Sequence, residues 1–414
     1  MVDVLVLNDA ARDHICGGWR PGGAWYSLNA LSGLKVPHGF VARGSPDDLS
    51  ALQQLPGHQG GLQLPRPRSV EYVVLNAEEL FEQCTIKCHE YGAFTDREFE
   101  QTASFLLGSR ARGVLVYPEY IDFLPYLGAA EIIAVDLQYL PPERREAALE
   151  RATVAFGSEG LFKQDRGLVD RLVDWAGNRP DRVLVQRFGP GGSRVFTGGK
   201  IFEICAFDIA LRDSVGAGDV YNAVFLAARI QGFPFDECGE VAAAAAALQC
   251  DRYAPGITDE AIRQIRADAP RTFCPPEVRA RCKVYLAGPF FDEGQVWVID
   301  RIRRVLSHQG FQVFSPMHDA GVAGDEASDD AIFSTDVAAL NESDMVVAVL
   351  DGEDPGTMWE CGYAYARGKR VLGYYTGGQL SALNLVTRTA MGPPVASNLR
   401  QLLLGVMKAC ARLG

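Results

Sequence analysis

Short apolar runs recur along the chain and alternate with amphipathic segments. Near-continuous apolar runs of this kind are expected of parallel strands whose two faces are both covered by helices. The first run, residues 4–7, leads into a glycine-rich stretch, and a second start of the same kind lies at 284–287, just before Gly288. The pattern therefore predicts an α/β protein with two parallel sheets. Further strands are expected at 72–75, 114–117, 132–135, 183–186 and 345–350.

Proline and polar residues concentrate between the two starts, at about 251–282. Such a composition between two apolar-patterned regions is typical of a linker. We therefore predict a first domain at 1–268, a linker at 269–282 and a second domain at 283–414. No internal repeat relates the two domains, so they are expected to be different α/β structures.

The charge balance limits the classes of partner. The 52 acidic and 40 basic side chains give a net charge of −12, which disfavours a nucleic-acid polymer or an anionic membrane. No apolar run is long enough to cross a bilayer, and the start of the chain reads as a strand and not as a signal peptide. The ten cysteines are scattered, so we expect a cytoplasmic protein with reduced thiols.

Two cysteines and a histidine form one cluster of potential metal ligands. Cys84, Cys88 and His89 carry metal-ligating atoms, but no second ligand pair follows at the spacing of a zinc site. The interpretation favoured here is a half-buried helix, with no metal site.

The strand expected at 345–350 is followed by a loop and a helix that carry several chemically useful residues. The loop contains Asp354-Pro-Gly, and Glu360 lies in the first turns of the helix. Ligands of open α/β sheets bind at the carboxyl ends of strands, and a helix N-terminus favours an ionised carboxylate. Taken alone, however, a glutamate near a helix start is more often a cap or a surface residue.

The region from 283 to about 392 resembles the nucleoside 2-deoxyribosyltransferase family. The matching pieces occur in the family's order: Tyr285-Leu-Ala-Gly288-Pro-Phe290, Asp336 ahead of Asn341-Glu-Ser-Asp344, Asp354-Pro-Gly-Thr-Met-Trp-Glu360-Cys-Gly-Tyr-Ala364, and Asn384-Leu. The resemblance implies a smaller, flavodoxin/Rossmann-like domain that needs no cofactor and that acts as a homo-oligomer.

The same resemblance implies a retaining double displacement at an N-glycosidic bond. Glu360 would attack the anomeric carbon and Asp336 would exchange a proton with the nucleobase. Two carboxyl groups in different environments suit such a reaction, whose transition state resembles an oxocarbenium ion. The substrate-binding residues implied are Tyr285, Gly288, Asp354 and Asn384, with Tyr285 positioning the nucleophile.

Two features bear on the substrate. The resemblance implies that Asp354 lies near the sugar 5′-hydroxyl, where its carboxylate would repel a 5′-phosphate. An unphosphorylated nucleoside is therefore favoured, whereas transfer and hydrolysis stay open. Phe290, Phe291 and Trp297 fit base stacking and a packed core equally well.

The first domain contains Asp213-Ser-Val-Gly-Ala-Gly-Asp219 directly before a long apolar helix. Small residues at a helix start let backbone N–H groups converge on an anion, and an aspartate there can accept a hydroxyl proton. Residues 1–265 resemble the ribokinase-like (PfkB) sugar and nucleoside kinases. The supporting pieces are Gly22-Gly23, Val135-Asp136, Phe188-Gly-Pro-Gly-Gly192, the alanine-rich helix at 241–248, and Ala254-Pro-Gly256.

This second resemblance implies a ribokinase-like parallel-sheet sandwich that uses ATP with Mg²⁺. Asp219 would be the catalytic base, and the amides of Gly216, Ala217 and Gly218 would stabilise the transferring phosphoryl group. Asp13 and Gly23 would contact the acceptor, and Gly189 and Gly191 the nucleotide. The sequence departs from the family at Ser27, where an asparagine is usual, and this concerns the acceptor pocket.

Together the two domains predict a bifunctional enzyme of nucleoside metabolism, whose small-molecule partners are a nucleoside or sugar and ATP. One domain would cleave or exchange an N-glycosidic bond, and the other would phosphorylate a sugar or nucleoside hydroxyl. The alternative is a nucleotide or N-riboside hydrolase fused to a kinase-derived domain that binds nucleosides without turnover.

Overall fold

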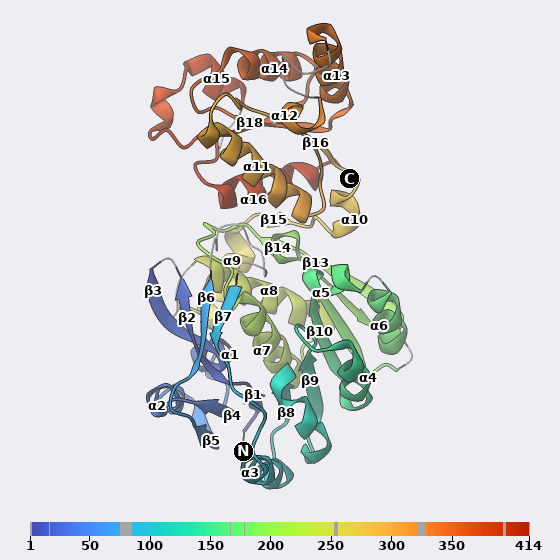
Figure 1. Ribbon diagram of the computed structural model, residues 1–414. Coiled ribbons are helices and arrows are strands. Elements are labelled where there is room, and N and C mark those ends of the chain that lie inside the picture. The colour runs from blue at the N-terminus through green and yellow to red at the C-terminus, as the bar shows by residue number, and fades with distance from the viewer. Residues whose placement is uncertain are drawn as a thin grey trace. The chain divides into compact units, whose positions relative to one another are not determined.

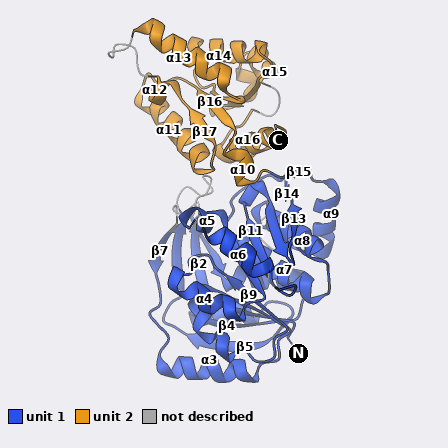
Figure 2. Cartoon of the chain, turned by 90° about the vertical axis from the view of Figure 1, so that its right-hand side faces the viewer, with its two compact units in different colours: residues 1–273 blue, residues 274–414 orange. Residues whose placement is uncertain are grey.

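The chain forms two compact units, residues 1–273 and 274–414 (Figures 1 and 2). The structure, a computed structural model, describes residues 2–15, 17–74, 85–165, 167–177, 179–251, 256–320, 328–391 and 395–413. Each unit has its own sheet, as the hydrophobic pattern predicts. Within the expected linker, β15 (Arg271–Thr272) pairs with β14 (Ala206–Phe207) of the first unit, and α10 (Pro276–Arg279) belongs to the second.

A nine-stranded sheet in the order β13-β12-β11-β10-β9-β8-β1-β4-β5 forms the centre of the first unit. The strands from β5 to β11 in this order are parallel, and β12 and β13 add an antiparallel edge. Their bounds are β1 (Val4–Leu7), β4 (His38–Gly44), β5 (His58–Pro65), β8 (Gly113–Val116), β9 (Ile132–Asp136), β10 (Val154–Ser158), β11 (Val183–Arg187), β12 (Ser193–Thr197) and β13 (Lys200–Ile204).

Both faces of this sheet are buried, which explains why its strands are apolar throughout. Val4 and Val6 point into one hydrophobic cluster, and Leu5 and Leu7 point into the other, because successive side chains of a strand alternate between faces. The first cluster is closed by α1 (Ala24–Gly33), α2 (Pro46–Gln53), α7 (Ala217–Ile230), α8 (Phe235–Asp251) and α9 (Asp259–Asp268). The second is closed by α3 (Asp96–Gly108), η3 (Pro118–Tyr126), α4 (Pro142–Arg151), α5 (Glu159–Gln164) and α6 (Leu168–Gly177).

A separate four-stranded sheet in the order β3-β2-β6-β7 stands next to the carboxyl end of β1, because β2 begins at Ala10, three residues after β1 ends. Its strands are β2 (Ala10–Ile15), β3 (Gly18–Gly23), β6 (Val70–Val74) and β7 (Thr85–His89). The prediction of a helix around Cys88 and His89 is therefore wrong. Both residues lie in β7, which pairs antiparallel with β6, and Cys84 lies outside the described residues.

The second unit has a parallel sheet in the order β17-β16-β18-β19. In chain order this is 2-1-3-4, as in flavodoxin-like folds, so the topological switch point lies between β16 and β18. The strands are β16 (Lys283–Ala287), β17 (Gln312–Phe314), β18 (Met345–Val349) and β19 (Arg370–Tyr374). The helices are α11 (Glu293–His308), α12 (Pro316–Asp319), α13 (Asp329–Glu342), α14 (Pro355–Ala366), α15 (Leu385–Ala390) and α16 (Leu399–Cys410). In the described part of the chain, every helix is too short or too polar to cross a membrane.

Candidate functional sites

Tyr285 and Glu360 meet at the switch point of the C-terminal sheet. Tyr285 is fully buried on β16, and its hydroxyl donates a 2.5 Å hydrogen bond to Glu360 Oε1. Glu360 lies on α14, the helix that follows β18. Because β16 and β18 are adjacent parallel strands, their pairing brings Tyr285 and Glu360 together. Burial raises the pKa of Glu360 to about 7 against the opposing effect of the Tyr285 bond, and the carboxylates of Asp336 and Asp354 raise it further. The site therefore holds a carboxyl group that changes its charge near neutral pH.

Asp336 supplies a second carboxyl group with a perturbed pKa. It lies on α13, and burial raises its pKa to about 6. Its Oδ1 atom is buried and has no hydrogen-bond partner among the described residues. An unpaired buried oxygen is costly unless a ligand satisfies it, so this oxygen is available to a group of the substrate.

Asp354 starts α14. Its Oδ2 accepts hydrogen bonds from the backbone N and the Oγ1 of Thr357, at 2.7 and 2.9 Å, and Pro355 occupies the first helical position. This is the pattern expected of an N-cap, and it fixes the helix end that carries Glu360. In the described part of the chain no hydrogen bond to Asp354 Oδ1 is formed, so that oxygen remains open to a ligand.

Two of the predicted substrate-binding residues have local structural roles. Asn384 is exposed, and its Oδ1 accepts from the backbone N of Val386 at the start of α15. No hydrogen bond joins Asn384 to Glu360 within the described residues. At Gly288 a Cβ atom would lie 2.5 Å from Ile299 Cδ1 and 3.0 Å from Val349 Cβ, so the packing of α11 on the sheet favours glycine there.

Of the aromatic residues that follow β16, Phe291 and Trp297 are not in the core. They are 75% and 59% exposed. Their exposure excludes the packed-core reading for these two residues.

In the N-terminal unit, the start of α7 forms a compact cradle of backbone amides. Gly216 is the N-cap in the left-handed region at φ 79°, where a side chain would be strained and would overlap the ring of Tyr26. Ala217, Gly218 and Asp219 form the first turn. The Ala217 N–H donates to Ser214 O at 3.1 Å, whereas the N–H groups of Gly218 and Asp219 have no partner inside the helix. A helix start of this kind can bind an anion, and the phosphate position expected there stays a prediction.

Asp219 is half-buried beside this cradle. Burial raises its pKa to about 7, and the Asp136 carboxylate adds to the shift, whereas a hydrogen bond from the Tyr117 hydroxyl opposes it. The hydroxyls of Tyr117 and Ser27 are 3.1 Å apart, and Ser27 also donates to the backbone oxygen of Asp219. Ser27, at the position where the related kinases usually have asparagine, therefore helps to fix the predicted base.

Arg187 was not identified from the sequence. It ends β11, and its Nη1 donates to Gly218 O and to Asn222 Oδ1, each at 2.9 Å. Its Nη2 lies 3.3 Å from Asp136 Oδ2, which also accepts from Asn222 at 2.6 Å. The only available sequence signal was its place at a strand end, immediately before the predicted nucleotide turn.

The Asp13 carboxylate is buried and forms a hydrogen bond within the protein. It is 4% exposed and accepts a 2.5 Å hydrogen bond from the Tyr26 hydroxyl. Tyr26 in turn accepts from Arg20, which forms a 2.8 Å ion pair with Asp213 in the loop before α7. The hairpin of β2 and β3 is thus tied to the start of α7.

The two remaining groups of predicted glycines lie in turns. Gly23, at φ 57°, is the N-cap of α1, and a side chain there would overlap the backbone oxygen of Asp9. Gly189 and Gly191 form a short 3₁₀ turn between β11 and β12, with Gly189 at φ 57°. The Ala254-Pro part of the predicted Ala254-Pro-Gly256 piece lies outside the described residues.

Comparisons with known proteins agree with both resemblances. The family model "Nucleoside 2-deoxyribosyltransferase" matches residues 284–387, and "pfkB family carbohydrate kinase" matches residues 139–261. A nucleoside kinase of Methanocaldococcus jannaschii is 32% identical over 115 residues, which is 27% of this chain. The match spans only 38% of that relative's length.

Solved structures resemble the N-terminal unit. A pyrophosphate-dependent kinase in the ribokinase family, in complex with a pyrophosphate analog and myo-inositol, has a TM-score of 0.50 at 15% identity and covers 63% of this chain and 99% of its own. The M. jannaschii nucleoside kinase, described as an archaeal member of the ribokinase family, has a TM-score of 0.48 at 17% identity, covering 64% and 98%. The chain is therefore similar to the pfkB carbohydrate kinases over residues 139–261 and to the nucleoside 2-deoxyribosyltransferases over residues 284–387.

Proposed function

We propose that the protein is a bifunctional enzyme of nucleoside metabolism. Its C-terminal unit cleaves or exchanges the N-glycosidic bond of a nucleoside through a glycosyl–Glu360 intermediate. Its N-terminal unit transfers a phosphoryl group from ATP to a hydroxyl of a sugar or nucleoside. The observation that carries the proposal is the hydrogen bond from Tyr285 to Glu360 at the switch point of the sheet, with Asp336 close enough to raise the pKa of Glu360.

The glycosidic step uses the two carboxyl groups in different protonation states. Ionised Glu360 attacks the anomeric carbon, the C–N bond breaks, and its electron pair goes to the base, which takes a proton from Asp336. Tyr285 holds the attacking carboxylate in place and stabilises its charge until the ester forms. A second base, or water, then attacks the anomeric carbon and releases Glu360, while Asp336 recovers its proton.

The phosphoryl-transfer site is built from α7 and β11. The residues present fit a nucleotide phosphate, because the amides at the start of α7 and the Arg187 guanidinium share one cradle. A Cβ at Gly218 would lie 2.7 Å from Arg187 Nη1, so a side chain there would displace the guanidinium from its present position. ATP would supply the phosphoryl group, with Mg²⁺ neutralising its phosphates. Asp219 accepts the proton of the acceptor hydroxyl, and the α7 amides stabilise charge on the transferring group.

The two units suggest one sequence of reactions. Cleavage of a nucleoside releases a sugar, and phosphorylation of that sugar traps it. Base release should therefore need no ATP, whereas a sugar phosphate should form only when ATP and Mg²⁺ are present. The test is a chromatographic screen of ribo- and deoxyribonucleosides and their 5′-monophosphates, with and without ATP. If none of these substrates releases a base, the proposed glycosidic activity is wrong.

The pH dependence of base release should show two limbs. Glu360 must be ionised and Asp336 protonated, and their pKa values are raised to about 7 and about 6. Only the form with Glu360 ionised and Asp336 protonated is active, so we expect kcat/KM to rise near pH 6, to fall near pH 7 and to have a narrow maximum between them. The Tyr285→Phe variant should move the falling limb to higher pH and lower the maximum, because the Tyr285 hydrogen bond lowers the pKa of Glu360 and the active form becomes rarer without it. An unchanged pH–rate profile in this variant would contradict the assignment of Glu360 as nucleophile.

The Asp354→Ser variant tests the preference for unphosphorylated nucleosides. Serine keeps an N-cap on α14 but removes a carboxylate near the expected 5′-position. We expect the ratio of kcat/KM for a 5′-monophosphate to that for the nucleoside to rise by about tenfold or more, because repulsion of the phosphate is relieved. The Asp351→Ser variant, in the same loop, is the matched control and should leave the ratio unchanged. An unchanged ratio in Asp354→Ser would place the 5′-end elsewhere.

A further inference from the structure

One carboxylate organises the loop that leads into α7, in which residues 208–214 form no helix or strand. Asp213 is 2% exposed, and its Oδ1 accepts a hydrogen bond from the backbone N of Val215 at 3.0 Å. The next residue, Ser214, accepts from the backbone N of Ala217 at 3.1 Å. The position of the Asp213 side chain therefore helps to set where α7 begins.

Arg20, on β3 of the small sheet, is the cation that meets this carboxylate. Its Nη2 lies 2.8 Å from Asp213 Oδ1 and its Nη1 lies 3.3 Å from Oδ2, so one guanidinium donates to both oxygens. The two side chains are 17% and 3% exposed, so water and salt screen the pair little. A bidentate pair fixes direction as well as distance, and Arg20 therefore holds Asp213 in one orientation.

Tyr26, on α1, adds a second contact between Arg20 and the start of α7. Its hydroxyl accepts from Arg20 Nε at 3.1 Å, and its ring occupies the space in which a side chain at Gly216 would lie. One guanidinium thus binds both the loop before α7 and the tyrosine that packs against the N-cap of α7.

The contacts of this loop with α8 are made by uncharged groups. Gln249 is 4% exposed, and its Nε2 donates to Val215 O at 3.1 Å. The backbone N of Arg212 donates to Cys250 O at 3.0 Å. Neither contact compensates the charge of Asp213, which is paired with Arg20.

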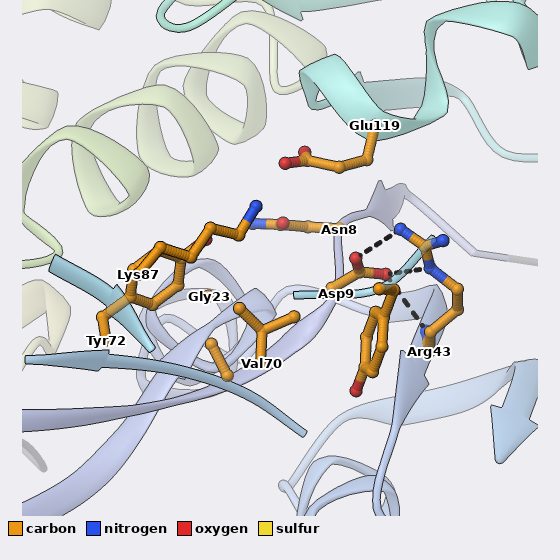
Figure 3. A pocket seen from close by; sticks show the side chains of 10 residues that line it. Asn8, Asp9, Gly23, Arg43, Val70, Tyr72, Lys87 and Glu119 are labelled. Atoms are coloured by element: carbon orange, nitrogen blue, oxygen red, sulfur yellow. Dashed lines mark hydrogen bonds and ion pairs between the residues drawn. The ribbon is translucent and has the colours of Figure 1, made fainter. Parts of the chain in front are cut away.

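A second buried pair, Arg43 with Asp9, shows what distinguishes Arg20. Arg43 binds Asp9 through Nη2 to Oδ2 at 2.7 Å and through Nε to Oδ1 at 3.0 Å, as Figure 3 shows. Its Nη1 donates to Gly92 O at 2.9 Å. None of these described partners belongs to α7 or to the loop before it. Arg20, in contrast, joins the small sheet to the helix start that is expected to bind phosphate.

The charge of Asp213 matters because this residue precedes Gly216 by only three positions. A buried carboxylate without a partner would repel an anion at the α7 amides. Loss of Arg20 would therefore act in two ways. The amides would be held less firmly, and the carboxylate would oppose the phosphate.

We propose that Arg20 is a positioning residue for phosphoryl transfer. Through Asp213 it orients the amides at the start of α7, and it neutralises the carboxylate beside them. The proposal deepens the proposed kinase function and rests on it for the transfer step. The order of the loop needs no substrate, however, and can be measured by itself.

The test compares Arg20→Gln, Arg20→Lys and Arg12→Gln with wild type in the full chain. Arg12 is the matched control, because it lies on β2 of the same small sheet and pairs with Asp48 of α2 at 2.9 Å. Hydrogen exchange of residues 213–220, without ligand, should be at least tenfold faster in Arg20→Gln. Calorimetric titration with ATP and Mg²⁺ should show binding at least tenfold weaker in this variant. Arg12→Gln should match wild type in both measurements.

The kinetic constants and the lysine variant separate positioning from a general loss of structure. Arg20→Gln should raise the KM for ATP and lower kcat, each at least tenfold, because the amides act on the bound nucleotide and on the transition state. Arg20→Lys keeps the charge but loses the bidentate geometry. Its affinity for ATP should lie closer to wild type than that of Arg20→Gln, whereas its exchange should still be at least threefold faster.

Three outcomes would overturn the proposal: exchange in Arg20→Gln within twofold of wild type, equal affinity of Arg20→Gln and wild type for ATP, or equally fast exchange in Arg12→Gln. If Arg20→Gln lacks a cooperative thermal unfolding transition, Arg20→Lys decides, and wild-type exchange in that variant would contradict the proposal. If wild type neither binds ATP nor transfers phosphate, the kinase function is wrong. Exchange in Arg20→Gln then still decides whether Arg20 holds the loop.

Discussion

The Glu360→Gln variant should release base from a nucleoside at least about 10³-fold more slowly than the wild-type protein, because an amide cannot form the glycosyl ester. Glutamine has the same shape, and its Oε1 can still accept the hydrogen bond that Tyr285 now donates to Glu360. The substitution therefore removes the nucleophile and leaves its surroundings in place. Chromatography of the free base at pH 6.5 measures the effect.

The unfolding temperature of Glu360→Gln distinguishes a loss of chemistry from a loss of folded protein. The pKa of Glu360 is raised to about 7 in the folded protein, mainly by burial, so folding favours the protonated carboxyl. That contribution is fully present below the pKa of the unfolded chain and is lost as the pH rises through about 7. Glutamine, which is neutral at every pH, should therefore unfold at an equal or higher temperature than wild type at pH 8. A lower unfolding temperature there would point to damage and not to lost chemistry.

The matched control is Glu342→Gln on α13. Glu342 is exposed and forms an ion pair with the exposed Lys283, an interaction of the kind that contributes little. Base release should be unchanged in this variant. If Glu360→Gln releases base at the rate of Glu342→Gln, Glu360 is not the nucleophile.

The central strands were predictable because a parallel sheet covered on both faces leaves no polar position. Residues 4–7 are all apolar since Val4 and Val6 enter one core and Leu5 and Leu7 the other. The segment from Cys84 to His89 has no such periodicity. Its pairing with β6 in a small edge sheet depends on contacts distant in sequence, and this explains why a helix was the wrong prediction.

The residues of the candidate sites also fall into those that local sequence predicts and those that depend on tertiary contacts. The start of α14 could be predicted from Asp354-Pro-Gly-Thr, since an N-cap and a following proline act locally. The approach of Tyr285 to Glu360 depends on the pairing of β16 with β18, and only the family resemblance indicated it. Arg187 has no local signal beyond its place at a strand end, because its role arises from Gly218, Asn222 and Asp136 on other elements. Sequence alone therefore gave the residues with family motifs and missed those defined by tertiary contacts.

The Asp219→Asn variant should lose phosphoryl transfer by about 10³- to 10⁴-fold, because an amide cannot take the proton of the acceptor hydroxyl. Burial and the Asp136 carboxylate raise the pKa of Asp219 to about 7, so the wild-type rate should climb as the pH passes through that value. Production of ADP in the presence of a sugar measures transfer. Asp236→Asn, an exposed residue of α8, is the control and should keep the full rate.

The two variants together test whether one chain carries both reactions. With nucleoside, ATP and Mg²⁺ supplied, Asp219→Asn should release base at the wild-type rate and accumulate unphosphorylated sugar. Glu360→Gln should release no base, yet it should still phosphorylate added sugar. If wild type and Asp219→Asn both accumulate free sugar, the N-terminal unit is a binding module. In that case the N-terminal unit would bind a ligand without transferring phosphate, and the hydrogen bond that Tyr26 donates to Asp13 would serve only the structure of that unit.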